Sequence, residues 1–206
     1  MSSNGPMVSE VSICNQALTW LGQDPISSLD DRSATAEWMR NNYPFLRDAV
    51  LEERMWTFAT ARDTFVTAAL DPFGTQYSHD IPSDWLAVYR VWRSVNGSEP
   101  SYWQVSTGWR REGNKILADD ATIYAWGLRR VTDPGQFSTL FVQALAGRLA
   151  ADACIPLTEN RALQVDMWNL YQTKLREAAA RDGQQGGPEE VGSNKYTVAR
   201  YRGGFG

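Results

Sequence analysis

Histidine, the side chain that most often acts as general base or metal ligand, occurs once in the 206-residue chain, as His79. One histidine cannot build a His-rich metal site, and the two cysteines, Cys14 and Cys154, do not stand at metal-ligand spacing. The chain also lacks the G-x-S-x-G, Walker-type and G-x-G-x-x-G motifs. We therefore predict no catalytic residue, no metal and no cofactor. His79 is predicted to lie in an exposed loop, and both cysteines are predicted to be buried free thiols.

Adjacent carboxylates are the remaining residues whose chemistry could serve hydrolysis. Glycosidases need two carboxyl groups roughly 5–10 Å apart across a sugar, one of them with a raised pKa. Adjacent residues rarely point into the same cleft, so we expect these pairs to be solvated at turns and on helix surfaces. A polysaccharide hydrolase stays open as an alternative, because aromatic side chains can bind sugars. The pairs are Asp30–Asp31, Glu52–Glu53, Asp119–Asp120 and Glu189–Glu190.

The last 13 residues, NKYTVARYRGGFG, combine aromatic and basic side chains. They carry three basic residues and no acid, whereas residues 1–193 contain 17 Lys/Arg and 24 Asp/Glu. An acidic body with a basic tip favours electrostatic contact with an acidic surface. In an extended segment, alternate side chains can fill pockets while the backbone adds to a sheet edge. The candidate partner-binding residues of this arm are Lys195, Tyr196, Val198, Arg200, Tyr201, Arg202 and Phe205.

Two other interpretations of this segment stay open. It is a solvated basic tail, or it binds nucleic acid by stacking its tyrosines on bases. Three positive charges alone give only weak, salt-sensitive binding to nucleic acid. Seven of the 25 residues from 182 onward are glycine, so we interpret residues 182–206 as a flexible arm.

The elements that must position these residues are predicted to form one α+β domain over residues 1–181. Ser9, Asp133 and Thr158 are candidate helix N-caps, and Gly22 is a candidate helix stop. Pro44 is expected to kink or split the second helix. Apolar residues at helical spacing predict four helices, over residues 9–22, 33–62, 134–155 and 158–181, the third ending at Pro156.

Residues 85–131 change to the pattern of β-strands. Aromatic residues and valine dominate from Trp85 to Trp92, and Asn96–Gly97 is a hairpin signal. Gly113–Asn114 and Asp119–Asp120 separate further short apolar runs. We predict a small antiparallel sheet of four strands joined in sequence order, inserted into the helical bundle.

No run of residues approaches the roughly 20 apolar residues of a membrane helix, and the opening residues lack the pattern of a signal peptide. We therefore expect no membrane anchor and a cytoplasmic location. The chain contains nine tryptophans, which is many for one small core. Their number favours a share of them at subunit contacts.

Four stretches of the chain occur in an order that is typical of one family. They are ICNQALTWLGQDPISSLDD, RDAVLEERMWTFATAR, IPSDWLAVYRV and RRVTDPGQFSTLFVQALAGRLAADACIPLTEN. Over residues 8–181 the chain resembles the tail tubular protein A family of short-tailed bacteriophages, the T7-like head-to-tail adaptors.

This resemblance implies a structural virion protein with no enzymatic activity, located at the head-tail interface and in the host cytoplasm during assembly. It implies a homo-dodecameric ring beneath the portal protein and above the tail nozzle protein, around the channel through which double-stranded DNA leaves. The arm would dock on the portal. The sheet and its loops would contact the nozzle, with Trp103, Trp109, Arg110 and Arg111 as candidates. A tail-associated polysaccharide hydrolase and a nucleic-acid-binding module stay open as alternatives.

Overall fold

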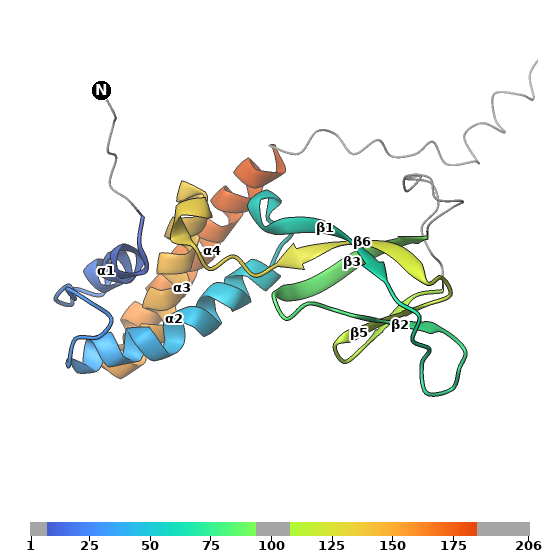
Figure 1. Ribbon diagram of the computed structural model, residues 1–206. Coiled ribbons are helices and arrows are strands. Elements are labelled where there is room, and N and C mark those ends of the chain that lie inside the picture. The colour runs from blue at the N-terminus through green and yellow to red at the C-terminus, as the bar shows by residue number, and fades with distance from the viewer. Residues whose placement is uncertain (1–7, 94–107, 185–206) are drawn as a thin grey trace, which may run out of the picture.

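The computed structural model describes residues 8–93 and 108–184 (Figure 1). Within these residues two helices precede six strands and two helices follow them, so the chain has the predicted α+β class. The helices pack together and the strands extend from one end of them (Figure 1). The helices are α1 (Glu10–Trp20), α2 (Ala34–Glu52), α3 (Thr139–Thr158) and α4 (Arg161–Gly183). The strands are β1 (Thr60–Val66), β2 (Tyr77–Asp80), β3 (Trp85–Arg93), β4 (Arg110–Glu112), β5 (Lys115–Ala118) and β6 (Thr122–Arg129).

Helix α1 begins and ends at the residues whose types favour it. The Ser9 hydroxyl accepts a hydrogen bond from the backbone N–H of Ser12 at 3.1 Å, and the Ser12 hydroxyl accepts one from the Ser9 N–H at 2.8 Å. This reciprocal pair is a capping box, which satisfies two orphan donors. Gly22 has a φ of +66°, a left-handed conformation that glycine adopts without strain and that ends the helix.

Helix α2 is shorter than expected, and the prediction of helix over 33–62 is wrong beyond residue 52. Pro44 lies inside α2, on its exposed face, and does not divide it. The chain leaves the helix because Trp56 turns into the core, where it is fully buried and its indole N–H donates to the Val50 carbonyl at 2.9 Å. A short 3-10 turn, Thr57–Ala59, then leads directly into β1.

The strands form two three-stranded antiparallel sheets rather than one sheet over 85–131. Sheet A has the order β1-β6-β3, and sheet B has the order β2-β5-β4. The predicted sequential pairing is wrong because β6 lies between β1 and β3, and because β1 and β2 precede residue 85. In β1 only Phe65 is buried, so the strand has no apolar alternation to reveal it. Of the expected turns, Gly113–Asn114 joins β4 to β5, whereas Asn96–Gly97 lies outside the described residues.

The two sheets share a small core of their own. Its buried side chains come from both sheets and from the segments that join them: Phe65, Ile81, Trp85, Val91, Ile116, Ala118, Ile123 and Ala125. Gly127 on β6 lies against the adjacent strand at this core. A Cβ atom at this position would be 2.1 Å from the carbonyl oxygen of Ala87 and 2.6 Å from the ring of Trp85. Only glycine therefore lets β6 approach β3 this closely.

Helices α3 and α4 both start and end later than expected. Ser138, rather than Asp133, caps α3, because residues 134–136 form a separate 3-10 turn. Pro156 lies inside α3, and the helix ends at Glu159, which adopts a left-handed φ of 54°. The cap of α4 is Asn160, not Thr158.

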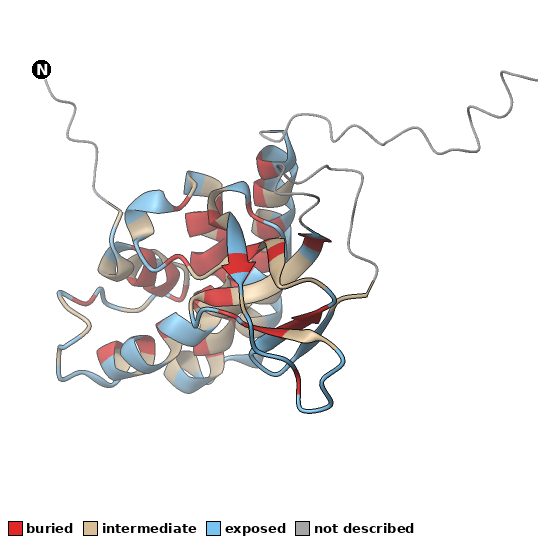
Figure 2. Ribbon diagram, turned by 45° about the vertical axis from the view of Figure 1, so that its right-hand side comes forward, coloured by how far each residue is buried: buried red, intermediate tan, exposed pale blue. Residues whose placement is uncertain are grey.

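Helix α3 is the centre of the bundle, since α1, α2 and α4 all pack against it. Figure 2 shows buried residues concentrated where the helices face one another. Gly147 allows a close approach, because a Cβ atom there would lie 3.1 Å from the Cα of Tyr171 on α4. Five other buried positions of α3 are alanine: Ala144, Ala146, Ala150, Ala151 and Ala153. Small residues thus let three helices contact one.

By length and composition α3 is also apolar enough to cross a membrane, with a mean hydropathy of 1.4 over 18 residues. The expectation that no segment approaches this composition is therefore wrong. Of that window 61% is buried inside the protein. A helix that packs against three others needs an apolar surface nearly all round, which explains the composition.

Four aromatic rings join the bundle to the sheets. Trp56, Phe58 and Phe137 surround Phe141 of α3, with ring centroids 5.0, 5.0 and 4.9 Å from its ring. The Trp56 and Phe58 rings are edge-on to Phe141, an arrangement that the ring quadrupoles favour. This junction cluster fixes the direction in which β1 leaves the helices.

The end of α4 is fastened to the same junction. The carboxylate of Asp182, itself buried, accepts hydrogen bonds from the N–H and the hydroxyl of Thr57, both at 2.9 Å. Asp182 was expected to begin the flexible arm, but it belongs to α4 and to the packed domain. Residues 185–206, the rest of the expected arm, lie outside the described residues.

The close approach at Gly127 gives a test of the sheet geometry. We expect Gly127→Ala to lower the free energy of unfolding by about 3 kcal/mol, because the new methyl group collides with backbone. Gly183→Ala is the matched control, since a Cβ atom there meets nothing within 4 Å. It should change the free energy of unfolding by less than about 1 kcal/mol. Urea titration followed by tryptophan fluorescence measures both, and equal effects would contradict the close packing of β6 on β3.

Candidate partner-binding surface

The candidate partner-binding residues fall into two groups. Trp109, Arg110 and Arg111 lie on or beside β4, at an edge of sheet B. The others lie outside the described residues: Trp103, Lys195, Tyr196, Val198, Arg200, Tyr201, Arg202 and Phe205. The edge of sheet B is therefore the part of the expected surface whose geometry is known.

The two arginines of β4 have partners within the chain. The Nε of Arg110 donates to Glu112 at 2.7 Å, and both side chains are half exposed. Arg111 donates from Nη1 to the carbonyl of Leu86 at 3.1 Å and from Nε to the carbonyl of Gly113 at 3.2 Å. Arg111 therefore connects β4 to β3. The half-buried Trp109 packs against the core between the sheets.

This geometry divides the predicted trio by role. Trp109 and Arg111 hold the edge of sheet B in place, whereas the Arg110–Glu112 pair faces solvent. An exposed ion pair contributes little to stability, so it can exchange its partners for those of a second protein at small cost. Arg110 is thus the member of the trio that is best placed to contact a partner.

Histidine 79 lies on β2 and is 1% exposed, so the prediction of an exposed loop is wrong. Its Nε2–H donates to the carbonyl of Asp120 at 3.0 Å, while Nδ1 has no hydrogen-bond partner within the part of the chain that the structure describes. Burial lowers the pKa of His79 below its ordinary value, and the hydrogen bond to Asp120 opposes that effect. The sequence of β2, YSHD, has too few apolar residues for the strand to be predicted from it.

The carboxylate pairs within the described residues make structural contacts. Asp31 accepts hydrogen bonds from two backbone N–H groups of its own loop. Glu53 accepts from the Tyr171 hydroxyl at 2.5 Å and from Arg148 at 3.3 Å. Asp119 accepts from Gln76 at 2.9 Å, and Asp120 lies 3.7 Å from Arg93. Glu189–Glu190 lies outside the described residues.

The cysteines are free and fully buried, as expected. Burial, together with the nearby Glu10 carboxylate, raises the pKa of the Cys14 thiol to about 12. A thiol with so high a pKa is a poor nucleophile. Over residues 8–93 and 108–184, no group of three or more His, Cys, Asp or Glu side chains is placed to hold a metal ion.

A row of side chains across sheet A was not foreseen from the sequence. Arg62 and Arg90 lie opposite Trp126 on the two neighbouring strands, with their guanidinium carbons 5.9 and 5.5 Å from its ring centroid. Tyr89 meets the same ring edge-on, with centroids 6.1 Å apart. Arg62, Arg90 and Trp126 come together only through the register of β6 with β1 and β3, and the sequence alone does not give that register.

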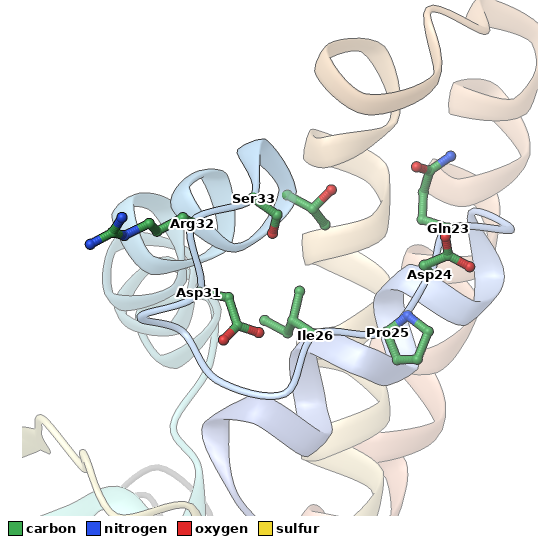
Figure 3. A pocket seen from close by; sticks show the side chains of 8 residues that line it. Gln23, Asp24, Pro25, Ile26, Asp31, Arg32 and Ser33 are labelled. Carbon is green, nitrogen blue, oxygen red and sulfur yellow. The ribbon is translucent and has the colours of Figure 1, made fainter.

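The loop between α1 and α2 borders an open cleft of about 530 Å³ (Figure 3). Ile26 and Asp31 lie at this cleft, and Arg32 points away from it (Figure 3). Asn15 on α1 holds Ile26 through two hydrogen bonds of 2.9 Å, to its N–H and its carbonyl. The polar groups of the loop are thus used to fix its own backbone.

Comparison with known proteins finds no match for this chain, neither among protein families nor among curated proteins.

The buried His79 predicts a pH dependence. Its folded-state pKa is lower than the unfolded value of 6.5, so the unfolded chain takes up the proton more readily. The stability that neutral His79 contributes is therefore complete above pH 6.5 and is lost as the pH falls below it. We expect the free energy of unfolding to drop more steeply between pH 7 and 5 in the wild-type chain than in His79→Gln.

Urea titrations at several pH values measure the difference between these two chains, and carboxylate titration common to both cancels in it. The imidazole proton of this single histidine, followed by NMR, gives the folded-state pKa directly. A pKa at or above 6.5, or equal slopes for both chains, would contradict the burial of His79.

Proposed function

We propose that the chain is a structural protein of a phage virion, an adaptor subunit that joins the portal to the tail nozzle in a homo-dodecameric ring around the DNA exit channel. The observation that carries the proposal is the junction cluster. Segments 47–62 and 129–160, which contribute most to the resemblance to the adaptor family, supply all four rings of that cluster. The resemblance therefore falls on residues that pack together, rather than on scattered surface positions.

The use of the carboxylates also favours a structural role. Asp31, Glu53 and Asp119 each accept hydrogen bonds from within the chain, so they are committed to holding loops and helix ends. A hydrolase needs one carboxyl group with a raised pKa in a sugar-sized cleft. Of the carboxylates that line the described clefts at the α1–α2 loop and at the end of α4, Asp31 and Asp182 already accept hydrogen bonds from within the chain. Among the described residues this leaves Asp24 alone at the α1–α2 cleft, not the pair of carboxyl groups that a glycosidase needs.

The position of α4 supports an arm that reaches a second protein. Asp182 anchors the helix end to Thr57, and the chain continues from there with 22 residues, 185–206. A segment that orders on binding loses affinity through its lost entropy, but twelve copies around a ring regain it by avidity. In this proposal the arm contacts the portal. The edge of sheet B, where Arg110 is exposed, contacts the nozzle.

Co-sedimentation with the portal ring of the same phage tests this function. We expect the full chain to sediment with the portal, and a chain that ends at Gln184 to remain in the supernatant. The shorter chain keeps the Asp182–Thr57 contact and therefore keeps the fold, which circular dichroism and urea titration verify.

If both chains sediment, the adaptor assignment stands and the role of the arm is wrong. If neither sediments, the adaptor assignment fails. The isolated chain is then assayed for polysaccharide hydrolysis, and for binding to DNA across a salt series, since nucleic-acid binding predicts a steep salt dependence.

A further inference from the structure

The last residue of β1 and the connection from β1 to β2 present apolar side chains to solvent. Phe73 is 85% exposed, Val66 73% and Leu70 52%. Exposed apolar residues are common when they occur singly, but three of them within the eight residues 66–73 indicate a contact site. We call residues 66–76 the Phe73 loop.

The Phe73 loop is held by hydrogen bonds of its own. The carboxylate of Asp71, 5% exposed, accepts from the N–H and the hydroxyl of Thr75 at 2.7 and 2.8 Å and from the N–H of Gln76 at 3.3 Å. The backbone N–H of Asp71 donates to the Gln76 carbonyl at 2.8 Å. Gly74 turns the chain with a φ of +68°. Gln76 in turn donates to the carbonyl of Gly108 at 2.7 Å.

These bonds give the loop a fixed shape before it meets a partner. A pre-organised aromatic side chain loses little conformational entropy on binding, which is the property of an interface anchor. Six backbone N–H groups of the loop already have acceptors within the chain, those of Thr67, Ala69, Asp71, Gly74, Thr75 and Gln76. The exposed apolar side chains are the groups of the loop that gain most from being covered.

A pocket that is open to solvent lies at the other end of the sheets. It has a volume of about 250 Å³ and lies between the segment after α2 and the end of α4, lined by Arg54, Met55, Trp56, Ala179, Asp182 and Gly183. This volume exceeds the roughly 150 Å³ of an enclosed cavity that holds a benzene molecule, so the open pocket has room for a phenyl ring. Met55 at this pocket is 49% exposed, although it is apolar.

The loop and the pocket of one chain do not meet. The pocket lies where the chain enters β1, and β1 then runs for seven residues, about 20 Å, before the loop begins. Figures 1 and 2 both show the β1–β2 connection at the end of the strands farthest from the helices. A contact between them therefore joins two copies, and it joins different surfaces, so it is head-to-tail and can close a ring.

The charges of the two regions favour the same pairing. The described residues before Thr57 and after Val131 contain 14 acidic and nine basic side chains, whereas those from Thr57 to Val131 contain eight basic and seven acidic ones. Two acidic helical bundles repel each other, while a sheet region against a bundle does not. Charge thus supports contact between the sheet region of one copy and the bundle of the next.

We infer that Phe73 of one subunit inserts into the Met55 pocket of the neighbouring subunit, and that this contact, repeated, closes the ring. The inference rests on the proposed adaptor function, which requires such a repeated contact. The inference names the two surfaces that form this repeated contact.

Disulfide cross-linking tests the contact in the full chain. The double variant Phe73→Cys, Met55→Cys is oxidised as the free chain over a concentration series and again on the portal. The native thiols give no background because Cys14 and Cys154 are fully buried. We expect a ladder of covalent oligomers up to the ring, because each chain carries both halves of the contact. Each single variant stops at dimers or does not react.

A matched control pairs Phe45→Cys with Met55→Cys. Phe45 is 75% exposed on α2, so this variant has the same number of surface thiols and is expected to give no ladder. A ladder confined to the 73/55 variant supports the contact, even if the portal is not bound and the adaptor function fails. Absence of a ladder both in solution and on portal-bound rings overturns the contact, while the adaptor function stands.

Complementation between charge variants gives a second test. Phe73→Asp alters the inserted side chain, and Met55→Asp alters the pocket that receives it. Each variant alone therefore has a defect in every contact and should need a roughly 10- to 30-fold higher concentration to assemble. Mixed together, a Met55→Asp chain still offers its Phe73 to the intact pocket of a Phe73→Asp chain. The mixture should therefore stop at a heterodimer, measured by light scattering. Full rings from either variant alone at the concentration at which the wild-type chain assembles, or no heterodimer from the mixture, would overturn the contact.

Discussion

A buried indole needs both an apolar wall and an acceptor for its N–H, and at the end of α2 the Trp56 side chain has both. Val50 supplies the acceptor from the last turns of the helix, and Phe141 supplies the wall from α3. Because the side chain following the helix is thus fixed inward, the backbone must turn at residues 53–56. The direction of β1 follows from that turn, and through β6 so does the position of both sheets.

A second constraint acts on the same place from the other end of the chain. Asp182 accepts hydrogen bonds from Thr57, the residue after Trp56, and Glu53, three residues before Trp56, accepts hydrogen bonds from Tyr171 and Arg148. Burial and the Glu53 contact raise the pKa of the Tyr171 hydroxyl, so it stays protonated and keeps donating. The bundle and the sheets are therefore joined by a short segment that is held from three helices.

What the sequence predicts well is what local chemistry decides. Ser9 and Gly22 mark the two ends of α1, because caps and left-handed stops depend on neighbouring residues. At α3 and α4 more than one capping residue stands within a few positions, and the caps are Ser138 and Asn160 instead of Asp133 and Thr158. The fold class also follows from local patterns. The extent of α2 does not, because the stretch from 53 to 62 has acceptable helix formers and is overruled by the burial of Trp56. The order of strands in sheet A depends on pairing between residues 60–66 and 122–129, which no local pattern records.

The candidate surface shows the same division. Trp109, Arg110 and Arg111 are adjacent in the sequence and lie together at the edge of sheet B, but their separate contacts depend on the distance to β3. His79 was placed in a loop because its neighbours are polar, and its burial comes from β5 and from the carbonyl of Asp120. The Phe73 loop contains a recognisable turn sequence, DPFG at residues 71–74, but the exposure of its apolar residues follows only from the folded structure.

The central position of α3 has a consequence for how the chain folds during synthesis. Helices α1 and α2 find their main packing surface on α3, which leaves the ribosome more than 80 residues after α2 does. Strand β1 likewise has no pairing partner until β6 has been synthesised. Long-range closure of this kind is slow, and it leaves apolar surface uncovered until late. Folding of the nascent amino-terminal half thus depends on the last two helices. A chain whose synthesis stops before residue 139 lacks the helix on which its core is built.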